Sequence, residues 1–72
     1  MRNVTIFGNF TVLQTFMLNG VQVDEGFDER LDIFYRTNLC VENNDDIYYE
    51  YVECYYRNID DLKEDLKKFN LD

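Results

Sequence analysis

The sequence contains no histidine, serine, alanine, proline or tryptophan among its 72 residues. Without histidine there is no side chain whose ordinary pKa lies near neutrality to shuttle protons, and no imidazole to bind a metal. Without serine and histidine the usual hydrolase triads are excluded, and a cysteine nucleophile lacks its customary base. Carboxylate-only catalysis stays open, but so small a chain offers little concave volume for a substrate. We therefore expect a protein that is not an enzyme and uses no cofactor.

Basic residues are scarce: seven of them face fifteen acids, which gives a formal charge of −8. This balance argues against direct binding of nucleic acid, which needs clustered lysine and arginine to neutralise phosphates. Residues 1–23 carry one base, Arg2, and no acid, so all fifteen acids lie in residues 24–72. The hydrophobic fraction of 46 % is too high for a disordered acidic tail. We expect one small folded domain over residues 1–72 with a polarised surface.

Long hydrophobic runs are also missing. The amino terminus alternates apolar and polar residues and lacks the unbroken core of a signal peptide, and no run is long enough to span a membrane. The only cysteines, Cys40 and Cys54, lie five residues out of register in the hairpin described below, roughly 16 Å along the strands. That separation is too large for a disulfide. The sequence therefore predicts reduced thiols in a cytoplasmic protein, and its many residues with AT-rich codons favour a bacterial host.

The carboxyl end predicts an amphipathic helix. Ile59, Leu62, Leu66 and Phe69 recur at helical spacing and form one apolar stripe. Asn58 is a favourable N-cap residue. Charges complement the helix dipole, with acids in the first turn and bases near the end: Asp60, Asp61, Lys67 and Lys68.

Residues 31–42 and 47–57 flank a turn-forming run at 43–46 and predict a hairpin. If opposite residues sum to 89, Asp32 faces Arg57 and Arg36 faces Glu53, two favourable charge pairs. A helix over 27–36 is the competing interpretation, which the charge pairs disfavour. The paired strands then share one apolar face, made of Leu31, Ile33, Tyr35, Leu39, Val41, Tyr48, Val52, Cys54 and Tyr56.

Asn19-Gly20 predicts a second hairpin, because both central residues of a type I′ turn need positive φ. Opposite residues then sum to 39, so that Val12 faces Phe27. A short helix over 10–18 competes with this strand, and β-branched residues disfavour it modestly. Val4–Phe7 is interpreted as a further strand. The expected fold is α+β: an antiparallel sheet of about four strands, in two hairpins, with one C-terminal amphipathic helix packed on one face.

Two features suggest a binding surface. Tyrosines on the second sheet face bury large areas while their hydroxyls stay hydrogen-bonded, although strands favour tyrosine in any case. Spaced carboxylates on a stiff scaffold can imitate a phosphate backbone, although an acidic surface also serves solubility. Asp24–Glu29 lacks the alternating ligands of a calcium loop, so no metal is expected. The residues expected to bind a partner are Asp24, Glu25, Asp28, Glu29, Asp32, Phe34, Asp45, Asp46, Tyr49, Tyr51, Glu53 and Tyr55.

In size, acidity and tyrosine content the chain resembles phage-encoded inhibitors of host nucleic-acid-handling systems, anti-CRISPR proteins among them. The resemblance is one of composition and transfers no site. The leading hypothesis is an inhibitor that docks carboxylates and tyrosines onto a basic surface of a host nucleic-acid-binding protein, as a nucleic-acid mimic. The alternative is a structural or regulatory homo-oligomer, such as a homodimer, that associates through its tyrosine-rich sheet face.

Overall fold

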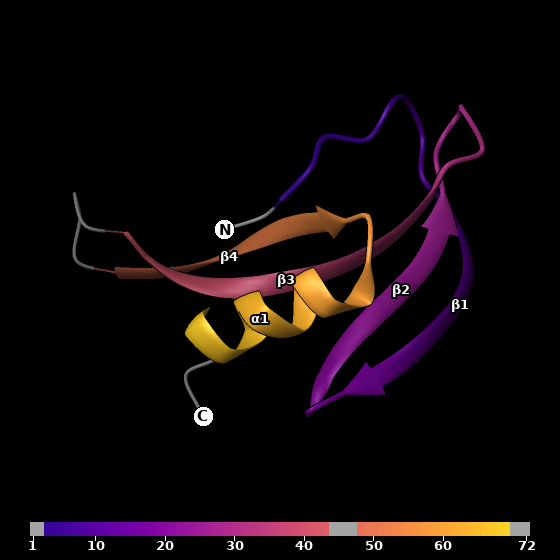
Figure 1. Ribbon diagram of the computed structural model, residues 1–72. Coiled ribbons are helices and arrows are strands. Elements are labelled where there is room, and N and C mark those ends of the chain that lie inside the picture. The colour runs from indigo at the N-terminus through magenta and orange to yellow at the C-terminus, as the bar shows by residue number, and fades with distance from the viewer. Residues whose placement is uncertain (1–2, 44–47, 70–72) are drawn as a thin grey trace.

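The computed structural model describes residues 3–43 and 48–69, with the side chains of 42, 43, 48, 49 and 69 left out of the description. Four strands form one antiparallel sheet in chain order, and a helix follows (Figure 1). The α+β expectation is thus confirmed. The elements are β1 (Thr11–Leu18), β2 (Val21–Phe27), β3 (Ile33–Asn43), β4 (Tyr48–Tyr56) and α1 (Ile59–Phe69).

The first hairpin forms around the predicted turn. Asn19 and Gly20 have φ of 52° and 80°, the positive values that a type I′ turn requires. The predicted register holds from Leu18↔Val21 to Gln14↔Glu25, so the helical interpretation of 10–18 is wrong. Beyond Gln14 the register shifts by one residue at a bulge, which places Val12 opposite Gly26 and corrects its predicted pairing with Phe27.

The second hairpin forms with a different register. Opposite residues sum to 91, as in Leu39↔Val52, and not to 89. Arg36 therefore faces Tyr55, and Glu53 faces Asn38, so the predicted charge pair between Arg36 and Glu53 is wrong. A shift of two residues preserves the side-chain alternation, so both strands still present their expected faces.

The strand β3 begins later than predicted. Leu31 has φ of 66° and is exposed, so it belongs to the connection after β2 and not to the apolar face. Asp32 also precedes β3, which removes its predicted pairing with Arg57. Residues 27–36 span the end of β2, this connection and the start of β3, so the competing helix is absent from them. Val4–Phe7 is not a strand in the structure.

The helix α1 begins as its sequence predicts. The Asn58 side chain accepts a hydrogen bond from Asp61 N–H at 2.9 Å, and its own amide donates to Asp61 Oδ2 at 3.0 Å. This reciprocal pair satisfies one backbone donor of the first turn, the Asp61 N–H. Acids occupy that turn and lysines the last. No helix among the described residues is long and apolar enough to cross a membrane.

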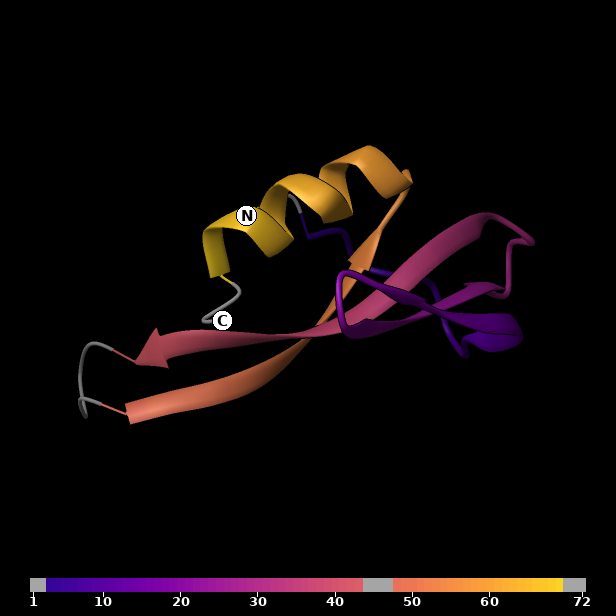
Figure 2. The ribbon, with the colours of Figure 1, turned by 90° about the horizontal axis from the view of Figure 1, so that it is seen from below.

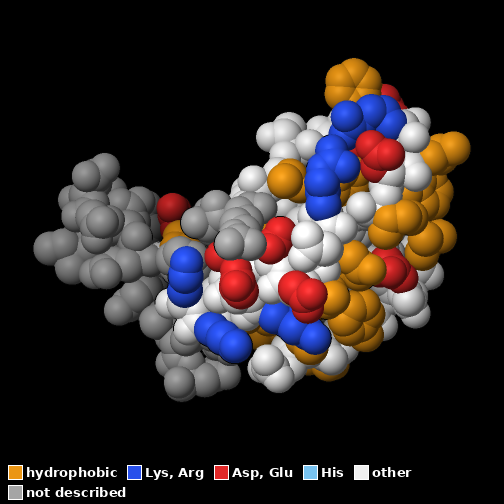
Figure 3. Space-filling model, in the orientation of Figure 1, with side chains coloured by type: hydrophobic (Ala, Val, Ile, Leu, Met, Phe, Trp, Pro, Cys, Tyr) orange, Lys and Arg blue, Asp and Glu red, His pale blue; other side chains and the backbone are white. Residues whose placement is uncertain are grey.

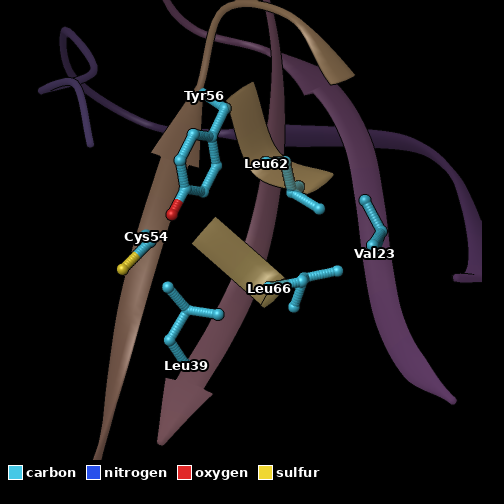
Figure 4. Packing of buried hydrophobic residues seen from close by; sticks show 6 residues of the cluster. All are labelled: Val23, Leu39, Cys54, Tyr56, Leu62 and Leu66. Atoms are coloured by element: carbon cyan, nitrogen blue, oxygen red, sulfur yellow. The ribbon is translucent and has the colours of Figure 1, made fainter. Parts of the chain in front are cut away.

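The core lies between α1 and one face of the sheet, here named the helix face (Figures 2 and 4). Leu62 and Leu66 project from α1 onto buried residues of three strands. The Tyr56 hydroxyl donates to Asp65 Oδ2 at 2.8 Å, which satisfies two polar groups inside this core. The opposite side of the sheet is named the outer face. The strand residues in the core cluster are Val23, Leu39, Cys54 and Tyr56.

Candidate interaction surface

A polar row crosses all four strands on the outer face. The register sets Thr15 beside Asp24, Asp24 beside Arg36, and Arg36 beside Tyr55. Asp24 accepts hydrogen bonds from Thr15 Oγ1 at 2.7 Å and from Arg36 Nη2 at 2.7 Å. The Thr15 hydrogen bond and the Arg36 charge lower the pKa of Asp24 despite its partial burial. The Asp24 charge is therefore compensated within the sheet.

Asp28 is the second acid with internal partners. Its side chain is buried and accepts hydrogen bonds from the backbone N–H groups of Phe7, Arg30 and Asp32 at 3.0–3.2 Å. The Arg30 guanidinium adds an ion pair at 3.0 Å. Burial disfavours the charged carboxylate, but these donors outweigh it and lower the pKa of Asp28. Asp28 holds the connection between β2 and β3 in place, and its carboxylate is engaged by internal partners.

Phe34 also departs from its expected role. The sequence predicts that Phe34 binds a partner, yet its side chain is fully buried on the outer face. Residues 3–10 cover this region: Val4 N–H donates to the Tyr55 carbonyl at 2.8 Å, and the Phe10 ring meets the Tyr55 ring edge-on at 5.3 Å. The Arg57 guanidinium lies 5.1 Å from the centre of the Phe34 ring. Phe34 and the residues 3–10 that cover the outer face around it therefore form a second, smaller core.

The remaining predicted acids are dispersed. Glu25 lies on the helix face, where it accepts a hydrogen bond from Gln14 Nε2 at 2.5 Å and raises the pKa of the Tyr35 hydroxyl by hydrogen bonding. Glu29 is exposed in the β2–β3 connection, and Asp32 lies 3.6 Å from Arg30. These carboxylates do not form one array with Asp24. Asp45 and Asp46 lie outside the described residues, as does the side chain of Tyr49.

The uncovered part of the outer face lies on the β3–β4 hairpin, which runs on beyond the end of α1 (Figures 1 and 2). Tyr51 is the most exposed of the large hydrophobic side chains described, at 78 %. Glu53 and Asn38 face each other across the strands and are also exposed, and Cys40 is half-buried opposite Tyr51. We name these four residues the hairpin surface.

The hairpin surface is electrostatically one-sided. Residues 37–56, the part of the hairpin that follows Arg36, contain five acids and no lysine or arginine. The Tyr55 hydroxyl donates to Glu53 Oε1 at 2.5 Å, which orients that carboxylate along the outer face. Sequence reasoning missed Asn38 and Cys40 as members of this surface, although the absence of bases in 37–56 was a signal that could have indicated it.

Neither Cys40 nor Cys54 forms a disulfide, and the two thiols lie on opposite faces of the sheet. Cys54 lies in the core and its pKa is raised by burial, whereas Cys40 belongs to the hairpin surface. In the part of the chain that the structure describes, no three histidine, cysteine, aspartate or glutamate side chains gather to hold a metal. No protein-family model matches the chain, and neither the curated proteins nor the solved structures contain a match.

Proposed function

We propose that the protein is a small, non-enzymatic inhibitor that docks its β3–β4 hairpin onto a basic surface of a bacterial nucleic-acid-handling or defence protein, in the manner of phage-encoded inhibitors. The observation that carries this proposal is the hairpin itself. It presents Tyr51 and Glu53 on an uncovered sheet face, and its segment 37–56 holds five acids without one base. Such a surface attracts lysine- and arginine-rich partners and repels nucleic acid.

The physical chemistry of the contact follows from its residues. Tyr51 offers a large, stiff ring whose hydroxyl can hydrogen-bond at an interface, the combination enriched in binding hot spots. Glu53 is oriented by the Tyr55 hydroxyl, so less side-chain freedom is lost when it pairs with a partner's base. Alternate residues on one strand stand about 6–7 Å apart, which is comparable to phosphate spacing along a nucleic acid strand.

This proposal moves the contact away from the first predicted acids. Asp24 is paired with Arg36, and Asp28 is paired with Arg30 and accepts from three backbone N–H groups. Releasing either carboxylate for a partner would leave these donors without that acceptor. The two acids of the hairpin whose side chains the structure describes have no such cost, because Glu50 and Glu53 are exposed and Glu53 accepts its hydrogen bond from the Tyr55 hydroxyl. Mimicry of nucleic acid is accordingly assigned to the hairpin surface alone.

The experiment compares capture by single variants. Wild type, Tyr51→Ala, Glu53→Gln and the matched control Glu64→Gln are immobilised and exposed to bacterial extract, and captured proteins are identified by mass spectrometry. The proposal predicts a basic nucleic-acid-binding protein that DNA or RNA displaces from the wild-type protein. Tyr51→Ala and Glu53→Gln should lose it, while Glu64→Gln, which removes an exposed acid from α1, should retain it. A partner without a basic surface, or equal capture by all four proteins, would contradict the proposal.

A further inference from the structure

The two edge strands of the sheet, β1 and β4, differ in whether another described segment of the chain covers them. Beside β4, Val4 N–H donates to the Tyr55 carbonyl, and Tyr55 N–H donates to Asn3 Oδ1 at 2.8 Å, so residues 3–4 cover this edge near its end. At the other edge, β1 pairs only with β2 among the described strands. An edge strand with unpaired backbone groups is a template for a further strand.

The side chains of β1 suit such pairing. The strand reads TVLQTFML and contains no charged residue, although lysine and other charges are the usual protection of an exposed edge. Val12, Leu13 and Met17 are large and exposed, with Met17 at 65 %. The helix α1 lies over β3 and β4 and leaves β1 uncovered. Hydrophobic side chains accordingly gather over β1 and β2, on the right in Figure 3.

We infer that β1 pairs antiparallel with β1 of a second copy of this chain, about a twofold axis, to give one continuous eight-stranded sheet. The distribution of charge favours a second copy of the chain as the partner of β1. Each copy carries −8, and all fifteen acids lie in residues 24–72, so the β1 edge brings two copies together without placing acid against acid. The β4 edge, which carries Glu50 and Glu53, cannot do so. A basic partner would gain nothing at a neutral strand.

The hairpin geometry also selects the register. Backbone groups of alternate residues in an antiparallel pair point toward the neighbouring strand and away from it. Counting from the turn, where Leu18 closes the hairpin onto Val21, Thr15 and Met17 direct their N–H and C=O groups outward. Greatest overlap of the two strands then sets Thr15 opposite Thr15 of the second copy. Met17 of each copy approaches the exposed Val12 of the other on the same face.

Sedimentation over a concentration series tests the interface. Wild type should show a monomer–dimer equilibrium. Met17→Glu should raise the dimer dissociation constant by at least about tenfold, because it buries a carboxylate against the apolar Val12 of the second copy. Tyr51→Glu makes the same charge change at an even more exposed residue of β4 and should leave the constant within about twofold. A wild type that is monomeric up to about 1 mM, or a dimer that only Tyr51→Glu dissociates, would overturn the inference.

Cross-linking tests the register even where a charge substitution disturbs folding. In a Cys40→Ser background, Thr15→Cys should oxidise to a covalent dimer, because hydrogen-bonded antiparallel partners have Cα atoms about 5.5 Å apart, within disulfide range. The control Gln22→Cys lies on β2, at least three strand spacings or about 14 Å from its mate, and should stay monomeric. Circular dichroism checks that both variants fold. Equal cross-linking of both variants, or none at residue 15, would contradict the β1 interface.

Discussion

Asp24 lies directly opposite Arg36 across the β2–β3 ladder, and Arg36 Nη2 approaches Asp24 Oδ2 to 2.7 Å. The same guanidinium lies 4.9 Å from the centre of the Phe10 ring, so it joins the polar row to the segment that covers the outer face. Both charged side chains are largely removed from solvent. One ion pair therefore fixes an acid that, from its sequence position, could have served a partner.

Replacing Arg36 should expose the role of this pair. Arg36→Gln leaves the largely buried Asp24 carboxylate without its base and removes the contact with Phe10. We expect a loss of about 1.5–3 kcal/mol in the free energy of unfolding, measured by urea titration at neutral pH. Lys63→Gln, which removes an exposed charge from α1, should change it by less than about 0.5 kcal/mol. Equal losses in the two variants would contradict this assignment.

Asp28 should make the protein sensitive to acid. Its pKa is lowered in the folded state, so its stabilising effect is fully present above the ordinary carboxylate pKa, near 3.9, and is lost as pH falls through the folded value. Asp28→Asn should lower Tm at pH 7, and the difference from wild type should shrink below about pH 4. Thermal unfolding across this range checks it. A pH-independent difference would show that the charge of Asp28 is irrelevant to its role.

Tyr56 should make the protein sensitive to alkali. Burial, followed by the hydrogen bond to Asp65, raises the pKa of Tyr56 strongly. The unfolded chain releases that proton above about pH 10 while the folded chain retains it, so stability should fall as pH rises beyond 10. Tyr56→Phe should cost about 1–3 kcal/mol at neutral pH, because the buried Asp65 loses a donor. It should also flatten the alkaline decline, as measured by urea titration. A decline as steep as that of wild type would contradict this origin.

Gly26 should be intolerant of any side chain. A Cβ there would overlap the Thr11 carbonyl oxygen and crowd the Phe10 ring, where the chain crosses the outer face on its way into β1. Gly26→Ala should cost about 1–3 kcal/mol, measured by urea titration. The control Gly20→Asn places a residue that accepts positive φ in open space at the turn, and its cost should be smaller. The reverse order would mean that residues 10–11 do not lie over β2.

Local patterns were sufficient to predict α1 and the β1–β2 hairpin. The apolar stripe and the Asn58 cap are contained within a few residues, and Asn19-Gly20 specifies both the turn and the register beside it. The β1 bulge was not predictable in this way. It arises where the chain enters the strand over Gly26.

The β3–β4 register failed for a different reason. Arg36 has no acid opposite it on β4, because its carboxylate partner is Asp24 on β2. When the hairpin is considered by itself, Glu53 is the acid on β4 that can pair with Arg36. The predicted register therefore differs from the observed one by two residues. The burial of Phe34 was missed similarly, since Asn3 contacts Tyr55 across 52 positions of sequence. Long-range partners, and not strand propensity, decided which residues remained on the hairpin surface.

The most direct test of the hairpin surface is the salt dependence of its affinity for the captured partner. Between about 0.01 M and 1 M ionic strength the Debye length falls from about 30 Å to 3 Å. If the hairpin's carboxylates attract a basic surface, Kd should rise steeply over this range, and Glu53→Gln should flatten the rise where Glu64→Gln does not. A wild-type Kd that stays constant as the ionic strength rises would contradict an electrostatic docking surface.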